Sequence, residues 1–232
     1  MKEVVTLIEI NNLYKSFGRS KVLEDLNLKL EEGKIYGLLG RNGVGKTTLL
    51  NIIGNQIRKS QGQIKVFGEE IFENPKVVEE VALVRENRYL AEDTKLRDIF
   101  KAGKDLYKDW DEEFKDYLVD EFNLRPNIRK KFIKLSKGNQ TLVGLIVGLA
   151  SRARLTIFDE PSLGLDAANR YKFYQLLLKD IENHPRSIII STHLIDEVAN
   201  LFEQVIILKD KKVYLHEDIE SLQEKSYFLN GR

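Results

Sequence analysis

The chain contains no cysteine among its 232 residues. Disulfide bonds, thiol catalysis and metal sites built on thiolates are therefore excluded. A long hydrophobic run is also missing. The longest, Leu142–Ala150, has nine residues and includes two glycines, whereas a helix that crosses a bilayer needs roughly 20. We therefore expect no membrane-spanning segment.

Neither sign of charge predominates. The 37 lysines and arginines almost balance the 36 aspartates and glutamates, which leaves a net charge of +1. This balance gives no electrostatic reason to expect nucleic acid as the main partner. With 42% hydrophobic residues, the chain can bury the core of one large domain, with room for a small insertion.

A complete phosphate-binding motif is present. Residues Gly40–Thr47 read GRNGVGKT, which matches G-x-x-x-x-G-K-[ST]. The apolar run Ile35–Leu39 predicts a strand before it, and residues 48–53 predict a helix after it. In that context the backbone amides face an anion, Lys46 reaches the β- and γ-phosphates, and the Thr47 hydroxyl binds Mg²⁺. A chance glycine-rich turn is the alternative, and the flanking strand and helix argue against it.

Strands and helices are predicted to alternate through most of the chain, which indicates an α/β fold with a mainly parallel sheet. Hydrophobic patterns predict further strands at residues 5–10, 26–30, 63–67, 81–84, 155–158, 187–191, 204–208 and 212–215. The same patterns predict helices at residues 138–150, 167–181 and 194–202.

Residues 92–134 differ from their surroundings. They are rich in charge, carry aromatic residues at helical spacing and contain no strand-like run. We interpret them as a helical insertion whose aromatic residues form its core. A cofactor-binding aromatic cluster is the less favoured alternative.

Two carboxylates follow the apolar run at residues 155–158. Asp159 is placed to hold Mg²⁺, and Glu160 to accept a proton from the water that attacks a γ-phosphate. His193 follows a second strand and is suited to hydrogen-bond that phosphate. Taken alone, the carboxylates also fit a solvated turn, and His193 also fits a core or surface role. His184 and His216 lie beside turns and are expected on the surface.

A second anion site is predicted at residues 135–139, LSKGN, which open a helix that Ser136 can cap. One phosphate loop does not need a second anion site in the same domain. The two sites make sense if the second binds the γ-phosphate held by another subunit.

Taken in their order along the chain, these motifs resemble the nucleotide-binding domain of ATP-binding cassette (ABC) proteins over nearly the whole sequence. Gly40–Thr47 corresponds to Walker A, Leu155–Asp159 to Walker B, residues 135–139 to the signature and residues 162–166 to the D-loop. The resemblance implies a P-loop NTPase of ABC type in residues 1–232. It would have a mainly parallel sheet core, an N-terminal antiparallel β part and a helical subdomain at about residues 88–150.

The resemblance also implies roles for individual residues. Catalysis is expected from Glu160, His193 and Lys46, and Mg²⁺ binding from Thr47, Asp159 and Glu86. Phe17, in the segment that resembles the A-loop, would stack on adenine. The residues expected to bind ATP are Phe17, Gly40, Asn42, Gly43, Gly45, Lys46, Thr47, Thr48, Ser136, Gly138 and Asp166.

Two departures from the family pattern stand out. The signature has Lys137 and Asn139 where the family has Gly and Gln, so Lys137 either adds positive charge near the phosphate or faces solvent, which we favour. Glu86 takes the place of the Q-loop glutamine, since no glutamine occurs between Gln63 and Gln140. A carboxylate binds Mg²⁺ but donates no hydrogen bond, so this change bears on coupling more than on ATP binding.

The expected function is that of an ATPase subunit that uses ATP and Mg²⁺, pairs as a homodimer or heterodimer of nucleotide-binding domains, and drives a separate transmembrane permease. Its expected location is cytoplasmic, on the inner face of the membrane, without a nucleic-acid partner. The sequence resembles exporters of the bacitracin-resistance or peptide-exporting type, although import stays open. The alternative is a soluble ABC ATPase that acts on ribosomes or nucleic acid. A small P-loop kinase or GTPase is disfavoured because neither explains residues 135–139.

Overall fold

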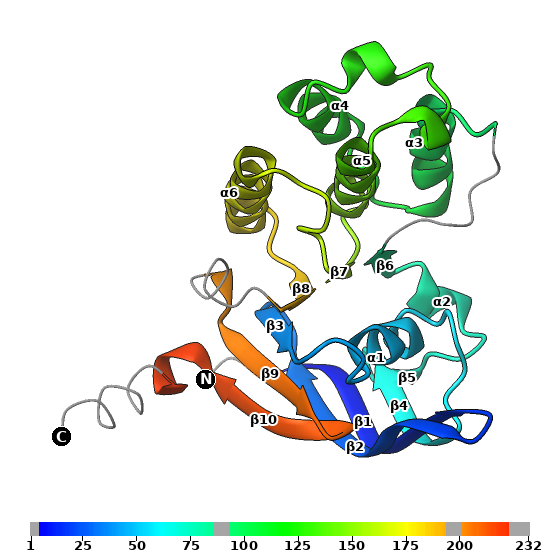
Figure 1. Ribbon diagram of the computed structural model, residues 1–232, viewed down its shortest axis with the longest axis vertical. Coiled ribbons are helices and arrows are strands. Elements are labelled where there is room, and N and C mark those ends of the chain that lie inside the picture. The colour runs from blue at the N-terminus through cyan, green and yellow to red at the C-terminus, as the bar shows by residue number, and fades with distance from the viewer. Residues whose placement is uncertain (1–4, 86–92, 194–200, 223–232) are drawn as a thin grey trace. The chain divides into compact units, whose positions relative to one another are not determined.

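The computed structural model describes residues 5–85, 93–193 and 201–222. The chain divides into two compact units. The first unit consists of residues 1–78 and 187–232, and the second of residues 79–186. Figure 1 shows the elements of both units.

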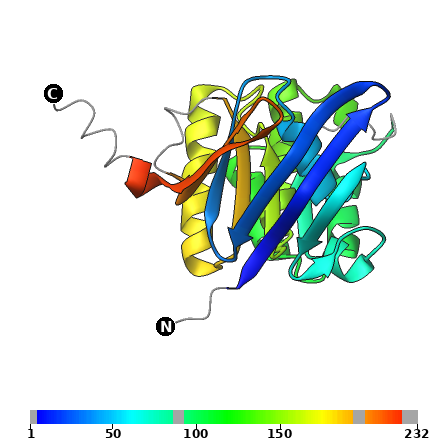
Figure 2. The same ribbon diagram turned by 90° about the horizontal axis from the view of Figure 1, so that it is seen from below.

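The first unit contains an antiparallel sheet of four strands in the order β2-β1-β4-β5. The strands are β1 (Thr6–Phe17), β2 (Ser20–Glu31), β4 (Gln61–Val66) and β5 (Glu69–Glu70). The long strands β1 and β2 form a hairpin, drawn in blue in Figure 2. Leu26, Leu28 and Leu30 of β2 are buried while the residues between them are exposed, as the alternating pattern predicts.

The first unit also contains a group of mainly parallel strands, in which β3 pairs in parallel with both β8 and β9, and β10 is antiparallel to β9. The strands are β3 (Ile35–Leu39), β8 (Ser187–Thr192), β9 (Gln204–Lys209) and β10 (Lys212–Asp218). Every residue of β3 and β8 is buried, which is typical of parallel strands. The helices of this unit are α1 (Lys46–Ile53) and α2 (Pro75–Val78).

The second unit combines a parallel pair of strands with helices. The strands are β6 (Val81–Val84) and β7 (Leu155–Asp159). The helices are α3 (Leu96–Leu106), α4 (Glu112–Glu121), α5 (Lys137–Ala150) and α6 (Ala167–Asn183), with short 3₁₀ turns η1 (Arg125–Asn127) and η2 (Phe132–Lys134). A Cβ atom at Gly148 of α5 would lie 2.5 Å from Val84 Cγ2 and 2.9 Å from Phe158 Cε1. The glycine therefore lets α5 pack closely against both strands.

The predicted α/β fold, with its antiparallel N-terminal part and mainly parallel strands, is confirmed. Two predictions of burial are wrong. Tyr117, expected in the core of the insertion, is 44% exposed because it lies on the outer face of α4. His216, expected on the surface, is half-buried because it lies within β10 rather than beside a turn. Most of the predicted helix at residues 194–202 lies outside the described residues.

Within the described residues, no helix is long and apolar enough to cross a bilayer.

Candidate functional site

The phosphate loop follows β3 in the first unit. Gly40 and Gly45 have φ angles of 153° and 114°. A Cβ atom at Gly40 would lie 2.8 Å from the Leu208 carbonyl oxygen, and one at Gly45 would lie 2.7 Å from Leu23 Cδ2. The loop is therefore held so closely between β2 and β9 that these positions require glycine.

Lys46, Thr47 and Thr48 form the first turn of α1. Lys46 is only 6% exposed, and its Nζ donates a 2.7 Å hydrogen bond to the Gly40 carbonyl, so the ammonium group lies over the loop. The N-cap, Gly45, has no side chain to cap the helix, which leaves the N-terminus of α1 suited to an anion. The exposed members of the site are Asn42, Gly43 and Thr47, while Thr48 is half-buried.

His193 lies at the same edge of the sheet as this loop. Leu39, the last residue of β3, pairs with Thr192, the last residue of β8. Gly40 and His193 therefore each leave the sheet one residue later, at the carboxyl ends of neighbouring parallel strands. The His193 side chain is exposed. Ligands bind at this edge of parallel sheets.

Phe17 lies at the end of β1 and is 50% exposed. The Nζ atom of Lys15 lies 4.7 Å from the centroid of its ring and also donates a 2.6 Å hydrogen bond to the Arg58 carbonyl. A cation thus packs on the aromatic ring. Phe17 is the exposed aromatic side chain that stacking on a base requires.

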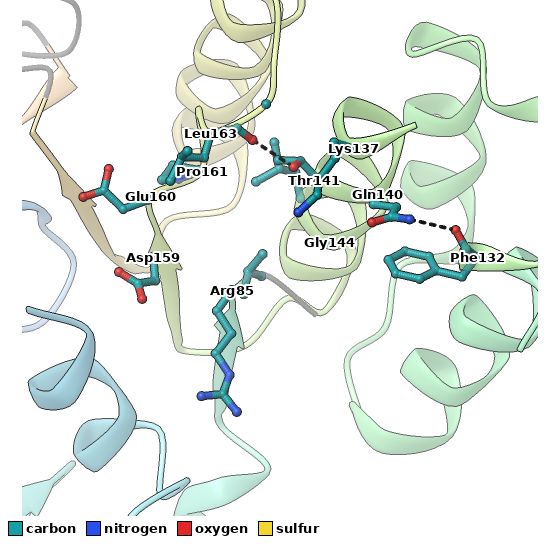
Figure 3. Close-up of a pocket in the computed structure, with 13 residues that line it drawn as sticks. Arg85, Phe132, Lys137, Gln140, Thr141, Gly144, Asp159, Glu160, Pro161 and Leu163 are labelled. Carbon is teal, nitrogen blue, oxygen red and sulfur yellow. Dashed lines mark hydrogen bonds between the residues drawn. The ribbon is translucent and has the colours of Figure 1, made fainter. Parts of the chain in front are cut away.

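In the second unit, Asp159 ends β7 and Glu160 begins the turn that follows. Glu160 has a φ angle of 51°, in the left-handed region that costs a non-glycine residue of the order of 1–3 kcal/mol. The turn is closed by a 3.1 Å hydrogen bond from the Leu163 amide to the Glu160 carbonyl. Figure 3 shows the two carboxylates at the end of β7, on the side away from Lys137 and Gln140 of α5. Strain of this kind is concentrated at functional sites.

The start of α5 packs directly on this turn. The Ser136 hydroxyl caps α5 by accepting a 3.3 Å hydrogen bond from the Asn139 amide. A Cβ atom at Gly138 would lie 2.8 Å from the Gly164 carbonyl oxygen, and Thr141 Oγ1 donates a 3.0 Å hydrogen bond to the Leu163 carbonyl (Figure 3). The signature and the turn after Glu160 therefore form one packed structure.

Asp166 ends the same turn and caps α6. Its carboxylate accepts hydrogen bonds from the Asn169 amide at 2.8 Å and from Asn169 Nδ2 at 3.0 Å. Within the second unit the structure thus brings together Asp159, Glu160, Ser136, Gly138 and Asp166, although they are spread over about thirty residues of sequence.

A cavity of about 240 Å³ lies beside the carboxylates, lined by residues that include Arg85, Phe132, Gly144, Asp159 and Pro161. Arg85, which directly follows β6, was not among the site residues predicted from the sequence. It directly precedes Glu86, the residue expected at the Q-loop position, and this proximity could have indicated it. Glu86, the predicted replacement for the Q-loop glutamine, lies outside the described residues.

Comparison with known sequences identifies a family and several relatives that match most of the chain. The family described as ABC transporter matches residues 23–163. AlbC of Bacillus subtilis, a putative ABC transporter ATP-binding protein by name, is 33% identical over 90% of this chain and 90% of its own length. The bacitracin transport ATP-binding protein BcrA of Bacillus licheniformis is 27% identical over 95% of this chain and 72% of its own length. The taurine import ATP-binding protein TauB of Escherichia coli is 31% identical over 87% and 79%.

Solved structures have the same fold. The ATP-binding subunit of an ABC transporter superposes with a TM-score of 0.84 at 22% identity, covering 95% of this chain and 93% of the other. A dimeric bacterial ABC transporter cassette gives a TM-score of 0.78 at 22% identity, covering 92% and 99%. Because the family model and the sequence relatives match most of its length, the chain belongs to the ABC transporter family, as an ATP-binding subunit that hydrolyses ATP.

Proposed function

We propose that this chain hydrolyses ATP in a composite site shared with a second nucleotide-binding domain, and that it drives a separate membrane subunit that exports peptides or other amphipathic compounds. One observation carries the proposal. Two helices, α1 and α5, begin at predicted phosphate-binding motifs, and each unit contains one of them. Two such N-termini fit an ATP molecule bound from both sides.

On one side of that site, the chain would bind ATP through its own phosphate loop. The buried Lys46 and the uncapped start of α1 attract the phosphates, and the exposed ring of Phe17 stacks on adenine. On the other side, Ser136 and Gly138 of the partner subunit contact the γ-phosphate. Asp166 keeps the D-loop in place by capping α6. The second domain is either a copy of this chain or a related one, and the light-scattering experiment below distinguishes the two.

In the hydrolysis step, Glu160 accepts a proton from the attacking water while Lys46 and His193 stabilise negative charge on the γ-phosphate. The Thr47 hydroxyl and the half-buried Asp159 carboxylate are the oxygen ligands that suit Mg²⁺. Mg²⁺ is usually held by one or two protein oxygens together with the phosphates of the nucleotide. Mg²⁺ would neutralise charge on the phosphates.

The membrane subunit would contact the chain near Glu86 and the helical subdomain, which we place at about residues 88–150. Loss of the γ-phosphate removes the contact with Ser136 and Gly138 of the partner subunit, so the dimer opens and the motion passes to the membrane subunit. The chain would act in the cytoplasm, on the inner face of the membrane. Export is supported by the similarity to BcrA, whose name states bacitracin transport, while the similarity to TauB keeps import as the competing direction.

The catalytic assignment is tested by Glu160→Gln, with Glu182→Gln, an exposed glutamate of α6, as the matched control. A glutamine side chain cannot accept the proton, so we expect turnover to fall by at least about 100-fold. ATP binding should persist, and an ATP-bound dimer should accumulate in size-exclusion chromatography with light scattering. A purified variant that stays monomeric with ATP would indicate a different partner domain. Normal turnover in Glu160→Gln would refute the catalytic assignment.

The transport assignment is tested by purifying the tagged chain from detergent-solubilised membranes. We expect a membrane subunit to co-purify, and inside-out vesicles that contain both chains to accumulate an amphipathic peptide when ATP is added. Uptake by right-side-out vesicles that were loaded with ATP would instead indicate import. Co-purification of ribosomes or DNA without a membrane protein would favour the alternative function.

A further inference from the structure

A long part of the second unit contains basic residues and no acidic ones. No aspartate or glutamate occurs between Glu121 and Asp159, whereas lysine and arginine occur eight times there. The whole chain has a net charge of only +1. Positive charge is therefore concentrated in this part of the sequence.

Some of these cations are neutralised within the fold. Arg125 forms hydrogen bonds with Asp116 and Asp120, and Arg152 bonds to Asp111 and Asp180. Four others are different. The side chains of Arg129, Lys130, Lys131 and Lys134 are exposed and form no ion pair with any residue in the described ranges. We call these four residues, together with Ile133, the basic turn.

The backbone of the basic turn is held in place by a buried side chain and by backbone hydrogen bonds. Phe132 is 3% exposed and anchors η2. The Lys130 carbonyl accepts a 3.0 Å hydrogen bond from the Leu96 amide, and the Phe132 amide donates a 2.8 Å bond to the Thr94 carbonyl. Ile133, in contrast, is 45% exposed. Four cationic side chains and one aliphatic side chain are therefore exposed to solvent on a backbone that is held in place.

We propose that the basic turn binds anionic lipid headgroups at the membrane surface. Each lysine or arginine near an anionic bilayer strengthens binding by roughly fivefold, and a partly inserted Ile133 adds apolar contact. Four such cations give only weak binding on their own. That attraction is enough to orient a subunit that a membrane partner already holds. This lipid contact goes beyond the proposed ATPase function.

Nucleic acid is the other polyanion that such a surface attracts. Duplex binding usually neutralises about 6–10 phosphates along an extended basic face. The basic turn has four cations within six consecutive residues. The apolar side chain among them, Ile133, would find no apolar contact on a phosphate backbone. The observations therefore favour a bilayer surface.

The test uses co-sedimentation of the full chain with vesicles of phosphatidylcholine, with or without one third phosphatidylglycerol. The variant Arg129→Gln/Lys130→Gln/Lys131→Gln/Lys134→Gln is compared with the control Lys29→Gln/Lys65→Gln/Lys76→Gln/Lys179→Gln. The control residues are also exposed lysines, so both variants lower the net charge by four. We expect the wild type and the control to bind the anionic vesicles at low salt, the basic-turn variant to bind at least about tenfold more weakly, and high salt to release all three.

Ile133→Ser should weaken vesicle binding by a smaller factor, since it removes only the apolar contact. Equal binding by the basic-turn variant and the control would overturn the proposal. So would tighter binding of a DNA or RNA duplex than of anionic vesicles at the same salt concentration. ATPase activity and urea unfolding of each variant are measured in parallel. Normal activity with lost vesicle binding separates the lipid contact from the proposed function.

Discussion

Glu160 combines a proposed catalytic role with an unfavourable backbone conformation. Its φ angle of 51° places a side chain where glycine is preferred. Two contacts stabilise the turn in this conformation. The Leu163 amide donates a hydrogen bond to the Glu160 carbonyl, and Gly138 packs against Gly164. The packing of α5 on the turn thus holds the carboxylate at the end of β7.

Replacing Glu160 with Gly or with Ala separates strain from chemistry. Both variants lose the carboxylate, so neither should hydrolyse ATP. Glycine relieves the positive φ angle and alanine does not, so we expect Glu160→Gly to have the higher free energy of unfolding, by about 1 kcal/mol. Urea titration measures this difference. An alanine variant as stable as the glycine variant would show that the turn is not strained.

His216 is expected to make the stability of the chain depend on pH. Burial lowers the pKa of His216, against the opposing effect of Asp218 and Glu31, and its Nε2 lies 2.8 Å from Gln204 Oε1. Because its pKa is lower in the folded state, the unfolded state binds more protons as the pH falls through about 6.5. This contribution to stability is therefore present above that pH and is lost below it.

We expect the wild type to lose more stability than His216→Gln between pH 7.5 and 5.5. The difference in slope should be at most about 1.4 kcal/mol per pH unit, which is what one fully linked proton gives. Urea unfolding at a series of pH values measures the two slopes. Parallel slopes would show that His216 is not the titrating group.

At the scale of secondary structure, a buried charge network joins helices α4, α5 and α6. Asp180 of α6 is 6% exposed. It accepts hydrogen bonds from Arg152, which follows α5, and from Arg186 at 2.7 Å. Arg152 also donates to Asp111, the N-cap of α4. Burial lowers the pKa of Arg186, while Asp180 opposes the change.

Asp180→Asn should therefore destabilise the chain strongly, by about 3 kcal/mol, because the buried Arg186 loses its carboxylate partner and Arg152 keeps only Asp111. Asp120→Asn is the matched control, since Asp120 pairs with Arg125 at the surface, where solvent screens the attraction and the effect should be much smaller. Thermal and urea unfolding compare the two. Equal effects would mean that burial does not strengthen the network.

At the scale of the whole molecule, each unit carries one half of the proposed composite site. The phosphate loop belongs to the first unit, and the signature belongs to the second. A head-to-tail dimer would bring the first half of one subunit to the second half of its partner. The two halves should therefore be separable by mutation.

The separation is tested in the Glu160→Gln background, where the ATP-bound dimer should accumulate. Adding Gly138→Ala places a Cβ atom 2.8 Å from the Gly164 carbonyl oxygen, which should displace the signature from the turn. We expect the double variant to bind ATP as tightly as Glu160→Gln but to remain monomeric in light scattering. A double variant that dimerises normally would contradict the composite site.

The sequence by itself determined the features that depend on neighbours along the chain. The phosphate loop, the strand before it, the buried run of β7 and the cap at Ser136 could all be predicted, because each follows from local conformational preferences and hydrophobic periodicity. The order of these motifs was enough to indicate the family.

Tertiary structure decided what depends on contacts between distant residues. Local patterns do not contain the packing of Gly138 on Gly164, the strained φ angle of Glu160 or the network around Asp180, because these arise only when α5, α6 and the turn after β7 pack together. The burial of His216 and the exposure of Tyr117 were mispredicted for the same reason. A side chain is buried when other elements cover it, and its neighbours in sequence do not specify which elements those are.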